Sequence, residues 1–324
     1  MDKEESFFCR LRELLERFDT TFKVDTVKSC GNCYYCCTPV THYPWLYPLE
    51  KDFIDTYIDK TSTLVSLMEF QDFLLYTSYS VCPFYKIGTG CGIYTFRPLF
   101  CRIFGPIDTG KTVPHFCIYY NLKERIPFSE IKEFLYEYKL LNLDYTRYKL
   151  SYCQNKDEEF FLLLELGLEY MLLYEFSKAF NIFTRALELR PEDYSVYYNL
   201  GWVCFEIKSF HEAINYFTKA LEFGAGEKNY FTAYEKLAYF NIYEKIACTY
   251  TSLSQFDCAE EFYNKALKVN SGNIVCHTGL LIIYYRAGRI EEFNRRLKRL
   301  LVRFPEDETV QKFASLARDY FIFL

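Results

Sequence analysis

The sequence lacks any long hydrophobic run. No stretch of about 18 uncharged apolar residues occurs, which is the least that a membrane-spanning helix needs. The first residues, MDKEESFFCRLRELLERF, begin acidic and have neither a continuous apolar core nor a cleavage site, so they are not typical of a secretory signal. They predict an amphipathic helix with Phe7, Leu11, Leu14, Leu15 and Phe18 on one side. Both observations predict a cytoplasmic protein with no membrane partner.

The sequence also lacks an excess of positive charge. Its 38 Lys and Arg residues stand against 43 Asp and Glu residues, which gives a net charge of −5. Binding of nucleic acid or of an anionic membrane through a general positive field requires the opposite balance, so neither partner is expected. The motifs G-x-x-x-x-G-K-[ST], G-x-S-x-G and H-E-x-x-H are missing as well, so common nucleotidase and hydrolase chemistries have no support.

Aromatic side chains and cysteines are abundant. Phe occurs 32 times, Tyr occurs 31 times and hydrophobic residues make up 50% of the chain, which excludes a disordered protein and predicts helices packed through aromatic rings. Of the 14 cysteines, a cluster falls in residues 30–117: Cys30, Cys33, Cys36, Cys37, Cys82, Cys91, Cys101 and Cys117. The other cysteines occur singly in helical patterns and are expected to be small buried apolar residues.

Three explanations compete for the clustered cysteines: a metal site, a disulfide framework, and packing of small apolar side chains. A cytoplasmic location disfavours disulfides. In CGNCYYCC, residues 30–37, two overlapping C-x-x-C units allow sulfur atoms to converge on one ion. Cys36 and Cys37 are adjacent, so their side chains diverge and one of them is expected to serve a second ion or to face the core. Metal binding is the preferred interpretation.

A second cysteine-rich stretch, CPFYKIGTGCGIYTFRPLFCRIFG, adds features of a known family. The family's features occur here in order: first the C-x-x-C-x-x-C-C run, then the C-P-F sequence at Cys82, then Ile93-Tyr94 after Cys91, and finally R-P-x-x-C-R-x-F at residues 97–104. In this order they resemble the cysteine-cluster family of zinc- or iron-chelating domains, over about the first third of the chain. Because of their clustering, we predict that all the clustered cysteines are metal ligands, and the resemblance agrees with a metal-binding domain. Because thiolates suit both an iron–sulfur cluster and zinc, the sequence does not distinguish these cofactors or divide the ligands between sites.

Residues around these ligands carry further predictions. Arg97 and Arg102 flank Cys101, and a structural ion pair is preferred for them over binding of an anionic substrate. The glycines of IGTGCG, residues 87–92, predict a tight turn rather than a nucleotide loop. Between the two cysteine stretches two helices are predicted, the first of which begins at Pro48.

From Phe160 onward the same kinds of residue recur at a fixed period. The markers are Leu166, Gly167, Tyr170, Ala179, Phe183, Ala186 and Pro191, then Leu200, Gly201, Cys204, Ala213, Phe217 and Ala220, then Ala247, Tyr250, Ala259, Tyr263 and Ala266, and finally Leu281, Tyr284, Phe293, Leu297 and Pro305. The period, from Gly167 to Gly201, is that of the tetratricopeptide repeat (TPR), and the resemblance implies stacked helical hairpins. The step from Gly201 to Ala247 is longer than one period, so an insertion precedes the third set and is expected to lengthen its first helix by several turns.

The TPR resemblance implies a concave face lined by the first helix of each hairpin. By register, this face displays Leu164, Leu168 and Met171 in the first repeat, and Tyr198, Trp202 and Phe205 in the second. We predict Tyr198, Trp202 and Phe205 as residues that bind a protein or peptide partner. A face this apolar suits a hydrophobic peptide or, equally well, the cysteine domain of the same chain.

These patterns predict a mainly α protein in three parts: a cysteine-cluster domain with an N-terminal helix at residues 1–125, a helical linker at residues 126–157, and a TPR domain with a C-terminal capping helix at residues 158–324. The predicted function is metal binding, through zinc or an iron–sulfur cluster, combined with a TPR scaffold for protein interactions. The family resemblance also implies an alternative. Some relatives are flagellin lysine methylases, so the chain would be an iron–sulfur-dependent protein lysine methyltransferase whose TPR array presents the substrate.

Overall fold

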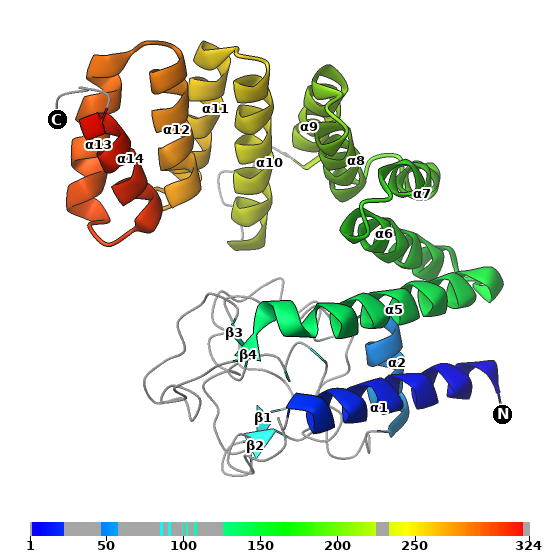
Figure 1. Cartoon of the computed structure of the whole chain (residues 1–324). Helices are drawn as coiled ribbons and strands as arrows, with labels where there is room; N and C mark the ends of the chain where they lie inside the picture. Colours follow the sequence, from blue (N-terminus) through cyan, green and yellow to red (C-terminus); the bar gives the residue numbers. More distant parts are fainter. Residues whose placement is uncertain are drawn as a thin grey trace. The chain divides into compact units, whose positions relative to one another are not determined.

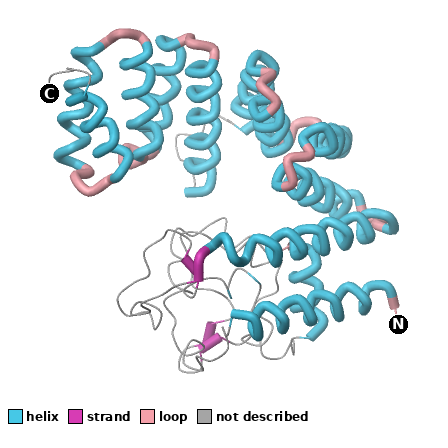
Figure 2. The backbone as a smooth tube through the Cα atoms, viewed as in Figure 1, coloured by secondary structure: helices cyan, strands magenta, loops and turns pink. Residues whose placement is uncertain are grey.

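A computed structural model describes residues 2–22, 47–57, 126–224 and 233–319, together with the short pieces 85–86, 90–91, 99, 102 and 107–108. Nearly all of the described residues lie in α-helices (Figures 1 and 2). Contacts between residues divide the chain into two compact units, Met1–Leu173 and Tyr174–Leu324. The predicted mainly α fold is therefore confirmed. None of the described helices combines the length and the apolar character needed to cross a membrane.

The first unit contains helices α1 (Lys3–Phe22), α2 (Pro48–Tyr57), α5 (Lys132–Tyr152) and α6 (Lys156–Leu172), with the 3₁₀ helix η5 (Phe128–Ile131) leading into α5. Helix α1 is amphipathic, as predicted, and all five of its predicted apolar residues are buried. Helix α2 begins at Pro48, also as predicted, because proline suits the first turn of a helix, where no backbone N–H is needed. The second predicted helix, between α2 and Cys82, lies outside the described residues.

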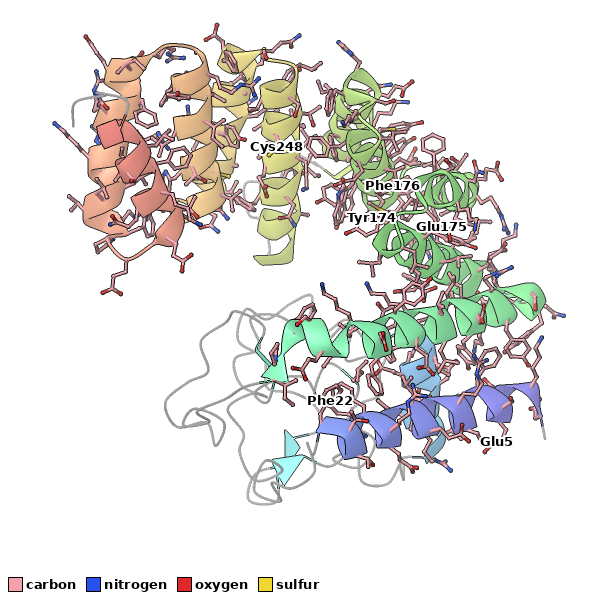
Figure 3. All side chains as sticks on the ribbon, viewed as in Figure 1. Glu5, Phe22, Tyr174, Glu175, Phe176 and Cys248 are labelled. Carbon is pink, nitrogen blue, oxygen red and sulfur yellow. The ribbon has the colours of Figure 1, made fainter. Side chains whose placement is uncertain are left out.

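Aromatic rings join α1, α2 and α5 into one core. Phe7 of α1 meets Tyr145 of α5 edge to face, with ring centroids 5.3 Å apart, and Phe8 meets Phe53 of α2 at 5.7 Å. Tyr47, directly before α2, meets Tyr138 of α5 at 5.4 Å. Aromatic pairs in such arrangements add about 0.5–1.5 kcal/mol each beyond the burial of their surface. The prediction of aromatic-packed helices holds for this core (Figure 3).

Four short strands accompany these helices. Strands β1 (Tyr85–Lys86) and β2 (Gly90–Cys91) pair antiparallel, with Lys86 opposite Gly90, so the chain reverses direction between these two residues. The predicted turn itself, at residues 87–89, lies outside the described residues. Strands β3 (Ile107–Asp108) and β4 (Ile126–Pro127) are parallel, with Ile107 opposite Ile126. Strands β1, β2 and β3 lie among the clustered cysteines in sequence, and β4 follows the last of them, Cys117.

The second unit contains α7 (Phe176–Leu189), α8 (Tyr194–Glu206), α9 (Phe210–Gly224), α10 (Ala233–Ser252), α11 (Phe256–Val269), α12 (Ile274–Arg286), α13 (Ile290–Arg303) and α14 (Glu308–Asp319). Consecutive helices pack against each other, which is the hairpin arrangement predicted from the repeats (Figure 1). Helix α10 has 20 residues where its counterpart α8 has 13, a difference of about two turns. Helix α14 closes the described array, as predicted.

Turn geometry repeats with the sequence period. Backbone φ is positive at Tyr174, Lys208, Ser254 and Gly288. Tyr174 and Lys208 are one repeat period apart, and so are Ser254 and Gly288. The interval from Lys208 to Ser254 is longer by the length of the insertion before α10. The turns that start α8, α12 and α14 are equally regular, because Asp193, Asn273 and Asp307 accept backbone N–H groups of the following helix. The repeat pattern therefore specifies both ends of each hairpin.

Small residues let the helices of a hairpin cross closely. Ala213 and Ala220 of α9 are buried, as is Phe217 between them. A Cβ atom added at Gly201 of α8 would lie 2.7 Å from the Phe217 ring, so only glycine fits without movement of that ring. The marker residues predicted from the period therefore form the contacts expected of them.

Candidate functional site

The predicted metal ligands fall almost entirely outside the described residues. Cys91 belongs to strand β2, opposite Tyr85, and Cys30, Cys33, Cys36, Cys37, Cys82, Cys101 and Cys117 are not among the described residues. Within the part of the chain that the structure describes, no group of three or more His, Cys, Asp or Glu residues could hold a metal ion. The ligand set therefore stays a prediction.

The cysteines outside the cluster are free thiols. Burial raises the pKa of the Cys204 thiol to about 11 and that of Cys276 to about 12. Both are therefore neutral at pH 7, and both are fully enclosed by the helices of the second unit. This environment agrees with their interpretation as small apolar residues. The same expectation is wrong for Cys258, which is exposed, and Cys9, Cys153 and Cys248 are only half-buried.

Two described residues lie on either side of Cys101 in sequence, and both contact helices of the first unit. The backbone N–H of Leu99 donates to Oε1 of Glu50 in α2 at 3.0 Å, and Leu99 is completely buried. The guanidinium of Arg102 forms a buried ion pair with Asp19 of α1. Of the two interpretations of Arg102, the structural ion pair is the one that the structure shows. Arg97 lies outside the described residues.

The Glu50 carboxyl is in an unusual electrostatic environment. Its side chain is 2% exposed, and this burial raises its pKa from 4.5 to about 7. The Leu99 N–H group, the Tyr138 hydroxyl and the charge of Arg102 act in the opposite direction and stabilise the carboxylate. Near neutral pH the group is therefore balanced between its two protonation states.

A polar network that the sequence did not predict links helices α1, α2, α5 and α6. The Tyr145 hydroxyl lies 2.7 Å from Oε1 of Glu4 and 2.7 Å from Oδ2 of Asp52. Nζ of Lys149 lies 3.0 Å from the same Asp52 carboxylate and 3.6 Å from Glu158 of α6. These contacts fix the mutual placement of α1, α2, α5 and α6; Asp19 lies on α1 and Glu50 on α2.

The three predicted partner-binding residues lie together on α8. The rings of Tyr198 and Trp202 are 6.2 Å apart, and Tyr198 also contacts Phe217 at 5.8 Å. All three side chains are half-buried, because they pack in part against the core of the same unit. We call Tyr198, Trp202 and Phe205 the α8 aromatic cluster. Part of its surface thus serves intramolecular packing, and part stays accessible.

Helix α10 contributes charged groups beside the α8 aromatic cluster. Nζ of Lys245 lies 5.2 Å from the centre of the Trp202 ring and 5.9 Å from that of Phe205. Burial, together with the nearby Glu244 carboxylate, raises the pKa of the Tyr198 hydroxyl above its usual value. Lys245 and Glu244 of α10 therefore border the aromatic rings, as does Glu206 of α8, which accepts from Nε1 of Trp202 at 3.0 Å. Cys248, labelled on α10 in Figure 3, follows Glu244 by one helical turn.

Comparison with known proteins agrees with both resemblances. Residues 29–118 match the CxxCxxCC family, described as "Putative zinc- or iron-chelating domain", and residues 194–223 and 240–273 match a tetratricopeptide repeat family. The chain therefore joins a CxxCxxCC domain to a TPR array. No curated protein matches the chain.

Several solved structures are similar to the helical part. A crystal structure of MamA is 22% identical, covers 57% of this chain and 95% of its own, and has a TM-score of 0.44. A tetratricopeptide repeat protein from Parabacteroides merdae is 17% identical, covers 60% of this chain and 71% of its own, and has a TM-score of 0.47. YrrB, "a TPR protein with an unusual peptide-binding site", is 18% identical, covers 49% of this chain and 76% of its own, and has a TM-score of 0.39. At these scores nothing about binding is transferred. Neither these comparisons nor the described residues favour the methyltransferase alternative.

Proposed function

We propose that this protein binds zinc or an iron–sulfur cluster through Cys30, Cys33, Cys36, Cys37, Cys82, Cys91, Cys101 and Cys117, in a reducing compartment such as the cytoplasm. The observation that carries the proposal is the match of residues 29–118, which contain all of these cysteines, to a family described as zinc- or iron-chelating. The donor set fits either cofactor, since thiolates are preferred ligands of both. Zinc would supply structural stability, and an iron–sulfur cluster would supply electron transfer.

The described backbone supports a ligand set gathered from separate stretches. In the β1–β2 pair Cys91 lies opposite Tyr85. Tyr85 follows Cys82 by three residues, so only a short stretch of chain separates Cys82 from the position opposite Cys91. The parallel pairing of β3 with β4 brings residues 107–108 beside residues 126–127, and Cys117 lies between these two pieces in sequence. Such short pairings reduce the conformational freedom of the chain between ligands and so favour binding.

Metal analysis tests this proposal. Iron, acid-labile sulfide and zinc should be measured on protein purified without oxygen, together with the visible absorption spectrum. We expect near-stoichiometric zinc, or iron with matching sulfide, and a marked loss of metal in Cys33→Ser. Cys258→Ser is the matched control, because Cys258 is an exposed free thiol on α11. Absence of metal, with every clustered thiol freely titratable in the folded protein, would contradict the proposal.

We further propose that the TPR array binds a segment of a protein partner at the α8 aromatic cluster. Accessible rings of Tyr198, Trp202 and Phe205 suit an apolar side chain, and the bordering Lys245 and Glu244 suit polar groups next to it. Buried aromatic residues in such positions frequently dominate binding energy.

Peptides selected from a random library on the intact protein test this second proposal. Trp202→Ala should weaken the selected peptides by tenfold or more, which corresponds to about 1.4 kcal/mol, while the metal content stays unchanged. Phe223→Ala is the control, because Phe223 is an exposed aromatic residue on α9 outside the cluster. Equal affinity of both variants and the wild type would exclude the α8 aromatic cluster as the binding surface.

A further inference from the structure

The two contacts beside Cys101 join parts of the chain that are distant in sequence. Arg102 and Asp19 are 83 residues apart, and Leu99 and Glu50 are 49 residues apart. Every one of these four residues is buried. Asp19 belongs to α1, which precedes the residues 29–118 that match the CxxCxxCC family. A helix outside the matched residues therefore contacts the R-P-x-x-C-R-x-F sequence within them.

Stability alone does not account for buried charges at these positions. Desolvation of an ion pair such as Asp19–Arg102 offsets most of its electrostatic attraction, and apolar residues of similar size often stabilise a protein equally well. Glu50 is almost completely enclosed as well, and its Oε1 atom accepts from the backbone N–H of Leu99. What these contacts do provide is a defined place for the backbone at residues 99 and 102, because hydrogen bonds are directional in a way that apolar packing is not.

Cys101 is covalently bonded to Arg102 and is separated from Leu99 by one residue. Consecutive Cα atoms are about 3.8 Å apart, so a fixed position at residues 99 and 102 restricts where the Cys101 backbone can lie. Restricting one ligand in advance lowers the entropy cost of assembling a ligand set from separate stretches of chain.

We propose that Asp19, acting through Arg102, and Glu50, acting through Leu99, are positioning residues of the metal centre. This inference rests on the metal binding proposed above. Around many metal sites, residues that do not bind the metal orient a ligand that does. The proposal assigns this role to Asp19 of α1 and Glu50 of α2. Loss of such an outer contact typically weakens metal binding by about 10–100-fold.

The test is the rate of metal loss from the intact protein. Protein reconstituted with Zn²⁺ is mixed with a chromogenic chelator, and if an iron–sulfur cluster is found instead, the decay of its visible absorbance under EDTA is followed. We expect Asp19→Asn to lose metal at least about tenfold faster than the wild type. Arg17→Gln is the matched control, since Arg17 lies on the same helix but forms an exposed ion pair with Glu137 of α5.

The Asp19–Arg102 pair also allows a double-mutant cycle. Asp19→Asn, Arg102→Gln and the double variant should show rates that are not multiplicative, because each change breaks the same contact. For Glu50, Glu50→Ala should accelerate metal loss, whereas Glu50→Gln, which keeps an acceptor oxygen for Leu99, should not. If Asp19→Asn fails to fold, Asp19→Glu and Arg102→Lys take its place, because each keeps the charge but changes the geometry of the pair. Each should lose metal faster than the wild type, by less than the tenfold expected of Asp19→Asn, and metal loss at the wild-type rate would contradict the inference.

The outcomes separate the inference from the function on which it rests. A wild-type protein that holds no metal would overturn the proposed function. A wild-type protein that holds metal, with Asp19→Asn, Arg102→Gln and Glu50→Ala folded and releasing it at the wild-type rate, would overturn the positioning role alone. Equal acceleration by Arg17→Gln would also overturn it, because the effect would then come from general loosening of α1.

Discussion

Replacing Glu50 by Gln should make the first unit more stable in alkaline solution and leave it nearly unchanged in acid. Glu50 is buried between α2 and the residues around Cys101, and its pKa is raised from 4.5 to about 7. In the unfolded chain the carboxyl ionises near its ordinary pKa. The folded protein therefore binds the proton more tightly than the unfolded chain does.

The sign of the pH dependence follows from linkage. Because the folded pKa is raised, wild-type stability is complete below about pH 4.5 and decreases as the pH rises to about 7, where the decrease ends. A difference of this size in pKa corresponds to about 3 kcal/mol. Gln keeps the size of the side chain and an acceptor for Leu99 N–H but cannot ionise. The variant should thus gain up to about 3 kcal/mol over the wild type at about pH 8 but less than about 1 kcal/mol at about pH 5.

Urea unfolding followed by tryptophan fluorescence measures this difference. The chain has 2 tryptophans, Trp45 and Trp202, so in a Trp202→Phe background the signal comes from the N-terminal half alone. The free energy of unfolding of Glu50→Gln is compared with that of the Glu50 protein at each pH, with equal metal content. This difference cancels the pH dependence that the thiolates add to both proteins. Glu13→Gln, an exposed change on α1, is the control. A gain of equal size at both pH values would refute the reasoning, since ionisation of Glu50 would then carry no penalty.

Three further changes probe the helical array and the metal. Lys208→Gly should raise the free energy of unfolding by up to about 1 kcal/mol, because φ is 65° at Lys208 and glycine adopts this conformation without strain. Gly279→Ala should lower it by about 1–3 kcal/mol, since the added Cβ would lie 2.4 Å from the Tyr263 ring, whereas Gly272→Ala, with its nearest atom at 3.7 Å, should change little. Both are checked by urea unfolding. Removing zinc with a strong chelator should reduce the helical circular dichroism of the first unit and leave the fluorescence of Trp202 unchanged.

The helical array could be predicted almost completely from sequence because its determinants are local. Markers such as Ala213, Phe217 and Ala220 recur at fixed spacing, and each hairpin closes through contacts between residues of the same or the next repeat. The turn residues follow the same period, including the insertion before α10. A pattern that repeats along the chain determines such a fold directly.

The contacts around Cys101 could not be predicted because they depend on partners far away in sequence. A signal for them was present, however. Asp19 directly follows Phe18 on the apolar side of α1. Glu50 directly follows the buried Leu49 and precedes the buried Phe53 by three residues on α2. A carboxylate among buried apolar residues requires a partner, because an unpaired buried charge is very costly. The sequence could show that a partner was needed, but only the fold shows which residue provides it.

Helix α6 explains why the boundary predicted from the repeats differs from the division given by contacts. Its markers Leu166 and Tyr170 continue the TPR register, so the sequence places it after residue 157, yet it belongs to the unit that ends at Leu173. The reason lies in α5, which packs against α6. Thr146 of α5 donates to Oε1 of Glu169 in α6 at 3.0 Å, and both residues are buried. The first helix of a repeat array has no preceding repeat, so its outer face needs a cover of another kind. Helix α5, predicted as a linker, provides that cover, and a repeat helix thereby becomes part of the cysteine-containing unit.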